Sequence, residues 1–112
     1  MSEKDIMKRK ADAVIEAYKS KRLRWVTGRS QVKMEIEEER YRKVVDSIMQ
    51  DEIERHMIIG AIKEKGLLTI EDIAQLTNLQ PSKILKHVIA LRRNGVLDEA
   101  GEKNRQYLYK LL

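Results

Sequence analysis

The sequence of 112 residues contains no cysteine, one proline and five glycines. The absence of cysteine excludes disulfide bonds and thiolate metal sites. No apolar run approaches the roughly 18 residues that a membrane-spanning helix needs, and the first residues lack the apolar stretch of a secretory signal. We therefore predict a cytoplasmic protein that does not interact with a membrane.

The sequence also lacks the motifs of catalytic and metal sites. There is no Walker loop, dinucleotide fingerprint or nucleophile–histidine–acid set, so we expect neither an enzyme nor a bound cofactor. The two histidines, His56 and His87, do not lie at the spacing of metal ligands, and we expect both at or near the surface. The consecutive glutamates at 37–39 point in different directions on a helix, which indicates a solvated face rather than a metal site.

Charge is abundant. Charged residues make up 37% of the chain, and the net charge is +5. Residues 1–33 contain ten bases and four acids, residues 34–58 four bases and eight acids, and residues 59–112 nine bases and six acids. Two basic ends thus flank an acidic middle. A basic chain favours polyanionic partners, although this pattern is also typical of an ordinary solvated helical surface.

Residues 3–26 have the apolar spacing of a helix. Met7, Val14, Tyr18 and Trp25 fall on one narrow face at the spacing of a heptad seam. Such a stripe is suited either to pairing two copies of the chain or to packing against the chain's own domain. We take these four residues as candidates for dimerisation.

The middle of the chain is less regular. Residues 27–30, Thr-Gly-Arg-Ser, break the helical pattern. A second helix is predicted over about 33–49, and a short hairpin within 23–36 is the alternative because apolar residues alternate there. We divide the chain into a helical extension, residues 1–50, and a separate domain, residues 51–112.

Start and stop signals for helices become clear from residue 51 onward. A helix that begins near Asp51 ends at Gly66, where glycine suits a left-handed cap. Thr69 then stands at the N-cap of a short helix, with Asp72 three residues further on, as in a capping box.

The remaining signals predict a turn, a longer helix and a hairpin. Asn78 suits the end of the short helix, Pro81 the first position of the next helix, and Gly95 its end. Apolar residues then alternate within 96–111 on both sides of residues 101–104, which predicts a β-hairpin with its turn at those four residues.

This order of elements is that of a winged helix-turn-helix. Residues 66–78 (Gly-Leu-Leu-Thr-Ile-Glu-Asp-Ile-Ala-Gln-Leu-Thr-Asn) and 81–97 (Pro-Ser-Lys-Ile-Leu-Lys-His-Val-Ile-Ala-Leu-Arg-Arg-Asn-Gly-Val-Leu) resemble winged-helix repressors of the MarR and ArsR kinds. The resemblance covers residues 51–112. It implies a mostly helical α+β winged-helix fold, here with an N-terminal helical extension, whose third helix enters the major groove of DNA.

The third helix of this domain has an apolar and a cationic side. Ile84, Val88 and Leu91 fall close together and are expected to face the core. Leu85 and Ile89 widen the apolar arc, so the hairpin, the N-terminal helix or another subunit is expected to cover them. The remaining arc carries a hydroxyl group, cations and no acid, which suits contact with phosphates and base edges. Its residues are Ser82, Lys83, Lys86, Ala90 and Arg93, with His87 at the edge.

The predicted hairpin departs from the pattern of these repressors, in which the tip is often basic. Lys103 and Arg105 are candidate phosphate contacts, but Asp98, Glu99 and Glu102 lie close to them in the sequence. Because of this departure, a domain that binds protein instead of DNA remains an alternative interpretation.

We therefore predict a sequence-specific double-stranded DNA-binding protein, a transcriptional regulator that acts as a homodimer through its N-terminal helix. The candidate DNA-binding residues are Ser82, Lys83, Lys86, His87, Arg93, Lys103 and Arg105. Two alternatives stay open. One is a winged-helix adaptor with a protein partner, and the other is a nonspecific nucleic-acid binder that acts through the basic N-terminus.

Overall fold

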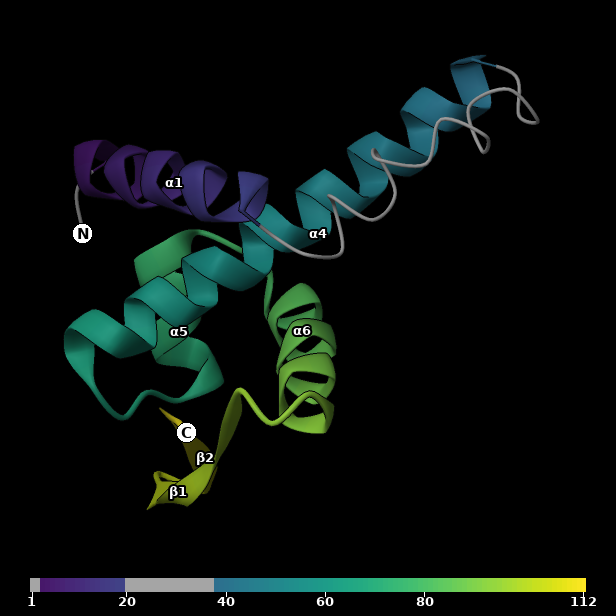
Figure 1. Cartoon of the computed structure of the whole chain (residues 1–112). Coiled ribbons are helices and arrows are strands. Elements are labelled where there is room, and N and C mark those ends of the chain that lie inside the picture. Colours follow the sequence, from purple (N-terminus) through teal and green to yellow (C-terminus); the bar gives the residue numbers. More distant parts are fainter. Residues whose placement is uncertain (1–2, 20–37) are drawn as a thin grey trace.

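The structure, a computed structural model, describes residues 3–19 and 38–112, and these residues are mostly helical (Figure 1). Four helices and one antiparallel hairpin make up the described part of the chain. Their bounds are α1 Glu3–Tyr18, α4 Glu38–Lys65, α5 Ile70–Thr77, α6 Pro81–Arg93, β1 Leu97–Lys103 and β2 Gln106–Leu111. Within the described residues, none of the helices has the length and apolar character that crossing a bilayer requires.

Helix α4 is a single helix of 28 residues. The sequence predicted two helices here, over about 33–49 and from residue 51. No glycine or proline separates them, so the helical hydrogen bonds continue without a break. The predicted boundary between residues 50 and 51 lies inside α4, and both α1 and the C-terminal elements pack against this helix (Figure 1).

Helix α1 packs against α4 through a different face from the predicted one. Its buried residues are Arg9, Ala13 and Ala17. The two alanines meet Ile53 and Met57 of α4, because small side chains let the helix backbones approach closely.

The predicted seam of α1 lies largely outside this contact. Val14 packs partly against the small cluster, whereas Met7 and Tyr18 are 65% and 66% exposed. Trp25, the end of the helix predicted over 3–26 and the alternative hairpin within 23–36 lie outside the described residues.

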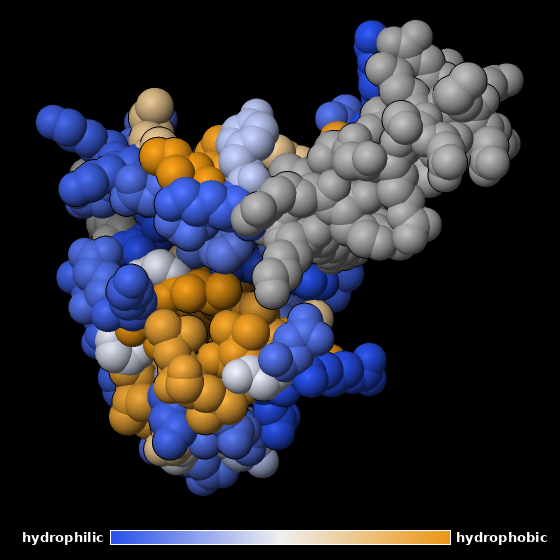
Figure 2. All heavy atoms as spheres, viewed as in Figure 1, coloured by the Kyte–Doolittle hydropathy of each residue, from blue (hydrophilic) through white to orange (hydrophobic). Residues whose placement is uncertain are grey.

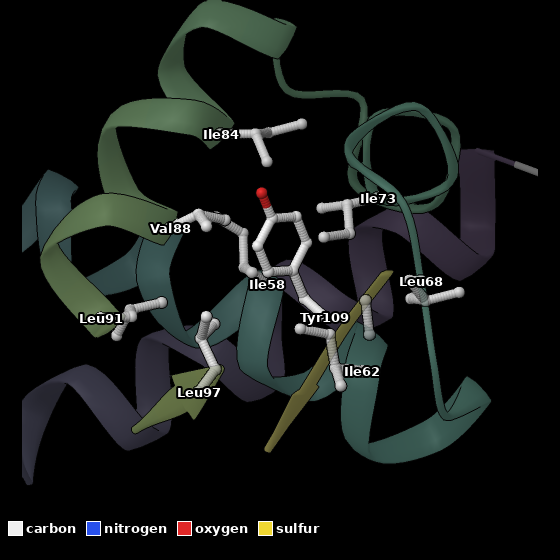
Figure 3. Packing of buried hydrophobic residues seen from close by; sticks show 10 residues of the cluster. Ile58, Ile62, Leu68, Ile73, Ile84, Val88, Leu91, Leu97 and Tyr109 are labelled. Carbon is white, nitrogen blue, oxygen red and sulfur yellow. The ribbon is translucent and has the colours of Figure 1, made fainter. Parts of the chain in front are cut away.

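The main core lies among α4, α5, α6 and the hairpin. The predicted inward stripe of α6, Ile84, Val88 and Leu91, is buried there. Figure 3 shows the ring of Tyr109 between α6 and the other helices, with its hydroxyl group pointing toward Ile84. The full buried set is Ile58, Ala61, Ile62, Leu68, Ile73, Ile84, Val88, Leu91, Leu97 and Tyr109.

The helix ends follow the predicted signals. Thr69 and Asp72 form a capping box, in which each side chain accepts a hydrogen bond from the other's backbone N–H at 3.1 Å. Gly66 and Asn78 have φ angles of 89° and 60°, the left-handed conformation that ends a helix. Pro81 occupies the first turn of α6. These caps fix a short connection, residues 78–80, between α5 and α6.

The hairpin turn is displaced from the predicted position. It consists of Asn104 and Arg105, with φ angles of 52° and 65°, and Lys103 pairs with Gln106 across it. Two successive positive φ angles are those of a type I′ turn. Gly101, which was expected in the turn, lies within β1 at a β-bulge. The first strand therefore extends further than predicted, to Lys103, and the tip of the hairpin carries residues 103–105.

Candidate nucleic-acid interface

The outer face of α6 is open to solvent. Ser82, Lys83, Lys86 and Arg93 are all exposed, on the side opposite the buried stripe. Figure 2 shows hydrophilic side chains projecting from the part of the molecule where α6 lies. Helix α6 contains no acidic residue, so nothing on the helix itself neutralises this cationic face.

The second apolar flank of α6 is also open. Leu85 is 46% exposed and Ile89 is 44% exposed, so α1 and the hairpin leave both residues largely open, and cover by another subunit stays a prediction. Together with residues of the cationic face they form a shallow hollow. It is lined by Arg55, Ser82, Leu85, Lys86, Ile89, Ala90 and Arg93.

His87 does not belong to this face, and the expectation of a surface position is wrong. The residue is 1% exposed and lies between α6 and α4. Its Nε2 lies 2.8 Å from Oε1 of Glu54, and its Nδ1 accepts a hydrogen bond from Nε of Arg55 at 3.3 Å. Position 87 is three residues from Ile84 and four from Leu91, so the ring lies close to the inward stripe. Glu54 supplies the hydrogen-bond partner that makes its burial tolerable.

These contacts favour one tautomer of the neutral His87 ring. The Nε–H of Arg55 can only donate, so Nδ1 of His87 must be the unprotonated acceptor. The proton of the neutral ring therefore sits on Nε2 and points at Glu54.

Glu54 is the centre of the network, and it was not among the residues expected from the sequence. It is 3% exposed, and its Oε2 accepts hydrogen bonds from Gln50 at 3.0 Å and from Lys83 at 3.4 Å. Burial alone raises the pKa of this carboxyl group, but the hydrogen bonds from His87 and Gln50 and the charge of Lys83 outweigh burial, so the pKa is lowered. A signal was present, because Glu54 shares a helix face with the core residues Ile58 and Ile62.

Asp51 lies near the same pair. Donor atoms of Asp51, Glu54 and His87 all fall within 4.8 Å of one another, a grouping that metal sites share. Here both ring nitrogens of His87 and both oxygens of Glu54 are engaged in hydrogen bonds, and two cations, Lys83 and Arg55, stand next to them. This arrangement is that of a buried hydrogen-bonded network, which joins α4 to α6.

The side chain of Lys83 is exposed but also paired with a carboxylate. Its side chain is 54% exposed, yet its Nζ lies 3.4 Å from Oε2 of Glu54. Its backbone N–H is also engaged, because it donates to the carbonyl of Gln80 at 3.0 Å. Lys83 is therefore a less available cation than Lys86 and Arg93, for which the described residues show no ion pair.

The charges of the hairpin are arranged in two groups. At its base, Arg92 of α6 lies 3.6 Å from Asp98 and 3.0 Å from Glu99, so these two carboxylates are paired. At its tip, Lys103 and Arg105 are exposed on either side of Asn104. The acidic residues that disfavour a phosphate contact thus lie mostly at the base of the hairpin. Glu102 alone stays near the tip, in register with Tyr107.

A comparison of the chain with models of protein families, with curated proteins and with solved structures finds no match.

Proposed function

We propose that this protein is a winged helix-turn-helix protein that binds double-stranded DNA sequence-specifically and regulates transcription. Helix α6 is the recognition helix in this proposal, and the hairpin is the wing. The observation that carries it is the open, acid-free face of α6, which contains Ser82, Lys86 and Arg93. Lysine and arginine contact phosphates and guanine edges, and a serine hydroxyl contacts either phosphates or bases.

Two further observations support the proposal. The inward stripe of α6 anchors the helix in the core, so the cationic face is held in one orientation. The exposed tip of the hairpin adds Lys103 and Arg105 at the end of a two-stranded arm, which suits a contact with the DNA backbone.

The experiment is selection of duplexes from a random pool by the purified protein, followed by affinity measurements on the selected sequence. We expect one enriched motif. We also expect Lys86→Glu to weaken binding about 30-fold, because losing one attraction and gaining one repulsion at about 4 Å in water amounts to about 2 kcal/mol. Lys63→Glu makes the same charge change at an exposed position at the end of α4 and should leave the affinity within about twofold, given screening at physiological salt. Equal losses in the two variants would remove α6 from the mechanism.

The protein is proposed to act as a homodimer through α1. The apolar residues Met7, Ile15 and Tyr18 are 65%, 56% and 66% exposed, which is unusual for large apolar side chains on one helix. Two-fold pairing would place two copies of α6 on half-sites about one helical turn of DNA apart. Light scattering should show a dimer, and Met7→Glu together with Tyr18→Glu should give a monomer with unchanged helical circular dichroism. A wild-type monomer at the concentrations that bind DNA would contradict this.

The exposure of Leu85 and Ile89 favours a second function, an adaptor that binds a protein through the same face. The random-pool selection separates the two functions. A DNA-binding regulator enriches a motif, whereas an adaptor enriches none.

A further inference from the structure

Arg55 is a cation at the edge of the proposed DNA-binding face, and it comes from α4 rather than from α6. Its side chain is 15% exposed and lines the same hollow as Ser82 and Lys86. It is held away from solvent by two contacts, the hydrogen bond from its Nε to Nδ1 of His87 and a 3.9 Å approach of its Nη1 to Glu52.

The surroundings of His87 set the conditions for releasing Arg55. From α4 the ring is faced by the carboxylate of Glu54, the guanidinium of Arg55 and the carboxylate of Asp51. From α6 itself, Lys83 reaches the far oxygen of Glu54. Arg55 requires an unprotonated Nδ1, while Glu54 accepts a hydrogen bond from Nε2 in either charge state of the ring.

We propose that protonation of His87 releases Arg55 to bind a DNA phosphate, so that binding of duplex DNA is accompanied by uptake of one proton. This inference rests on the proposed function. A proton from solvent binds Nδ1, which then becomes a donor and loses the hydrogen bond from Arg55. The imidazolium keeps its contact with Glu54 as an ion pair, and its positive charge repels the guanidinium into the hollow beside Lys86.

Proton and phosphate binding are then reciprocal. If the phosphate draws Arg55 out of the network, Glu54 loses a neighbouring cation, which favours a positive charge on His87. Linkage requires the effect in the other direction to be equal, so that acidification strengthens DNA binding. The direction is definite, because affinity must rise as the pH falls.

The test measures affinity, salt dependence and proton uptake with the full chain and a duplex, either a random pool or one selected from it. We expect the wild-type affinity to rise about tenfold between about pH 8 and about pH 5.5, as coupling between two binding events commonly gives. The log–log salt slope should become steeper by about 0.9, the contribution of one more neutralised phosphate. Titration calorimetry in two buffers of different ionisation enthalpy should show proton uptake.

Three variants assign the effect. His87→Gln removes the titrating ring, and Arg55→Gln removes the cation, so each should abolish the pH dependence and the proton uptake. His56→Gln is the matched control, because His56 is the other histidine and lies 3.7 Å from Glu52, so it reaches Arg55 only through that carboxylate. It should behave as the wild type. Circular dichroism establishes that each variant is folded, and Arg55→Gln, at a partly exposed position, covers the case in which His87→Gln does not fold.

The outcomes are distinguishable. Binding without proton uptake, or a pH dependence that persists in Arg55→Gln, overturns this inference and leaves the proposed function standing. A pH dependence that disappears in His56→Gln also overturns it, because the titrating group is then the wrong histidine. Absence of binding to any duplex refutes the proposed function and this inference together.

Discussion

The buried carboxylate of Glu54 provides a sharp test of the structure, because its removal has a predictable cost that depends on pH. In Glu54→Gln the amide oxygen still accepts a hydrogen bond from His87, but the acceptor is no longer charged. The contribution of this hydrogen bond to the free energy of unfolding therefore falls from about 2 kcal/mol to about 1 kcal/mol. The pairing with Lys83 is lost as well. Because that lysine is 54% exposed, its share is at most about 1 kcal/mol. The variant should therefore be about 1 to 2 kcal/mol less stable at pH 7.

The sign of the pH dependence follows from the lowered pKa of Glu54. A carboxyl group with a folded-state pKa below its unfolded value of 4.5 stabilises the fold above that pH, and the stabilisation is lost as the pH falls through the folded-state pKa. The glutamine variant has no such titration. The stability difference between wild type and variant should therefore be full at pH 7 and should shrink on acidification below about pH 4.5.

The assay is urea unfolding followed by circular dichroism at several pH values. Glu71→Gln serves as the control, since Glu71 is an exposed carboxylate that accepts one hydrogen bond from Gln106 at 3.0 Å, and the change there should be within about 0.5 kcal/mol. A Glu54→Gln protein as stable as the wild type, or a stability difference that is the same at acidic pH, would refute the network described for α4 and α6.

Two further predictions concern glycine and positive φ angles. Gly60 lies within α4, where a Cβ atom would meet only Nη1 of Arg9, at 3.7 Å. Gly60→Ala should therefore stabilise the protein by about 1 kcal/mol in urea unfolding. A destabilised variant would show that α1 packs more closely there. Arg105 has a φ of 65°, so Arg105→Gly should relieve about 1 kcal/mol of backbone strain. The same variant should bind duplex DNA severalfold more weakly because it loses a cation, whereas Arg105→Lys should change neither the stability nor the affinity. A stronger duplex complex in the glycine variant would exclude the hairpin tip from the interface.

The features that were predictable from the sequence are those set by neighbouring residues. The capping box of Thr69 and Asp72, the left-handed Asn78 and the inward stripe of α6 depend on residues within one or two turns, and all were predicted correctly. The hairpin was predicted, but its turn was misplaced, because glycine at residue 101 is the stronger local signal and the type I′ turn is formed by Asn104 and Arg105.

The features that were missed depend on contacts between distant residues. Glu54 and His87 are 33 residues apart, and only packing of α6 on α4 brings them together. The packed face of α1 was missed because small alanines and a buried Arg9, bonded to Glu64 at 2.8 Å, form it in place of the larger apolar side chains. An apolar stripe indicates where a helix is able to pack, but close approach of two backbones favours the face with the smallest residues.

The central claim is that the open face of α6 contacts duplex DNA. Backbone amide NMR shifts of the full chain, followed as a duplex is added, test it most directly because every residue is observed separately. We predict that the largest shift changes fall at Ser82, Lys86, Ala90 and Arg93, with a second group at residues 103–105. Changes that are confined to α1, or the absence of changes along α6 when the duplex is bound, would contradict the account.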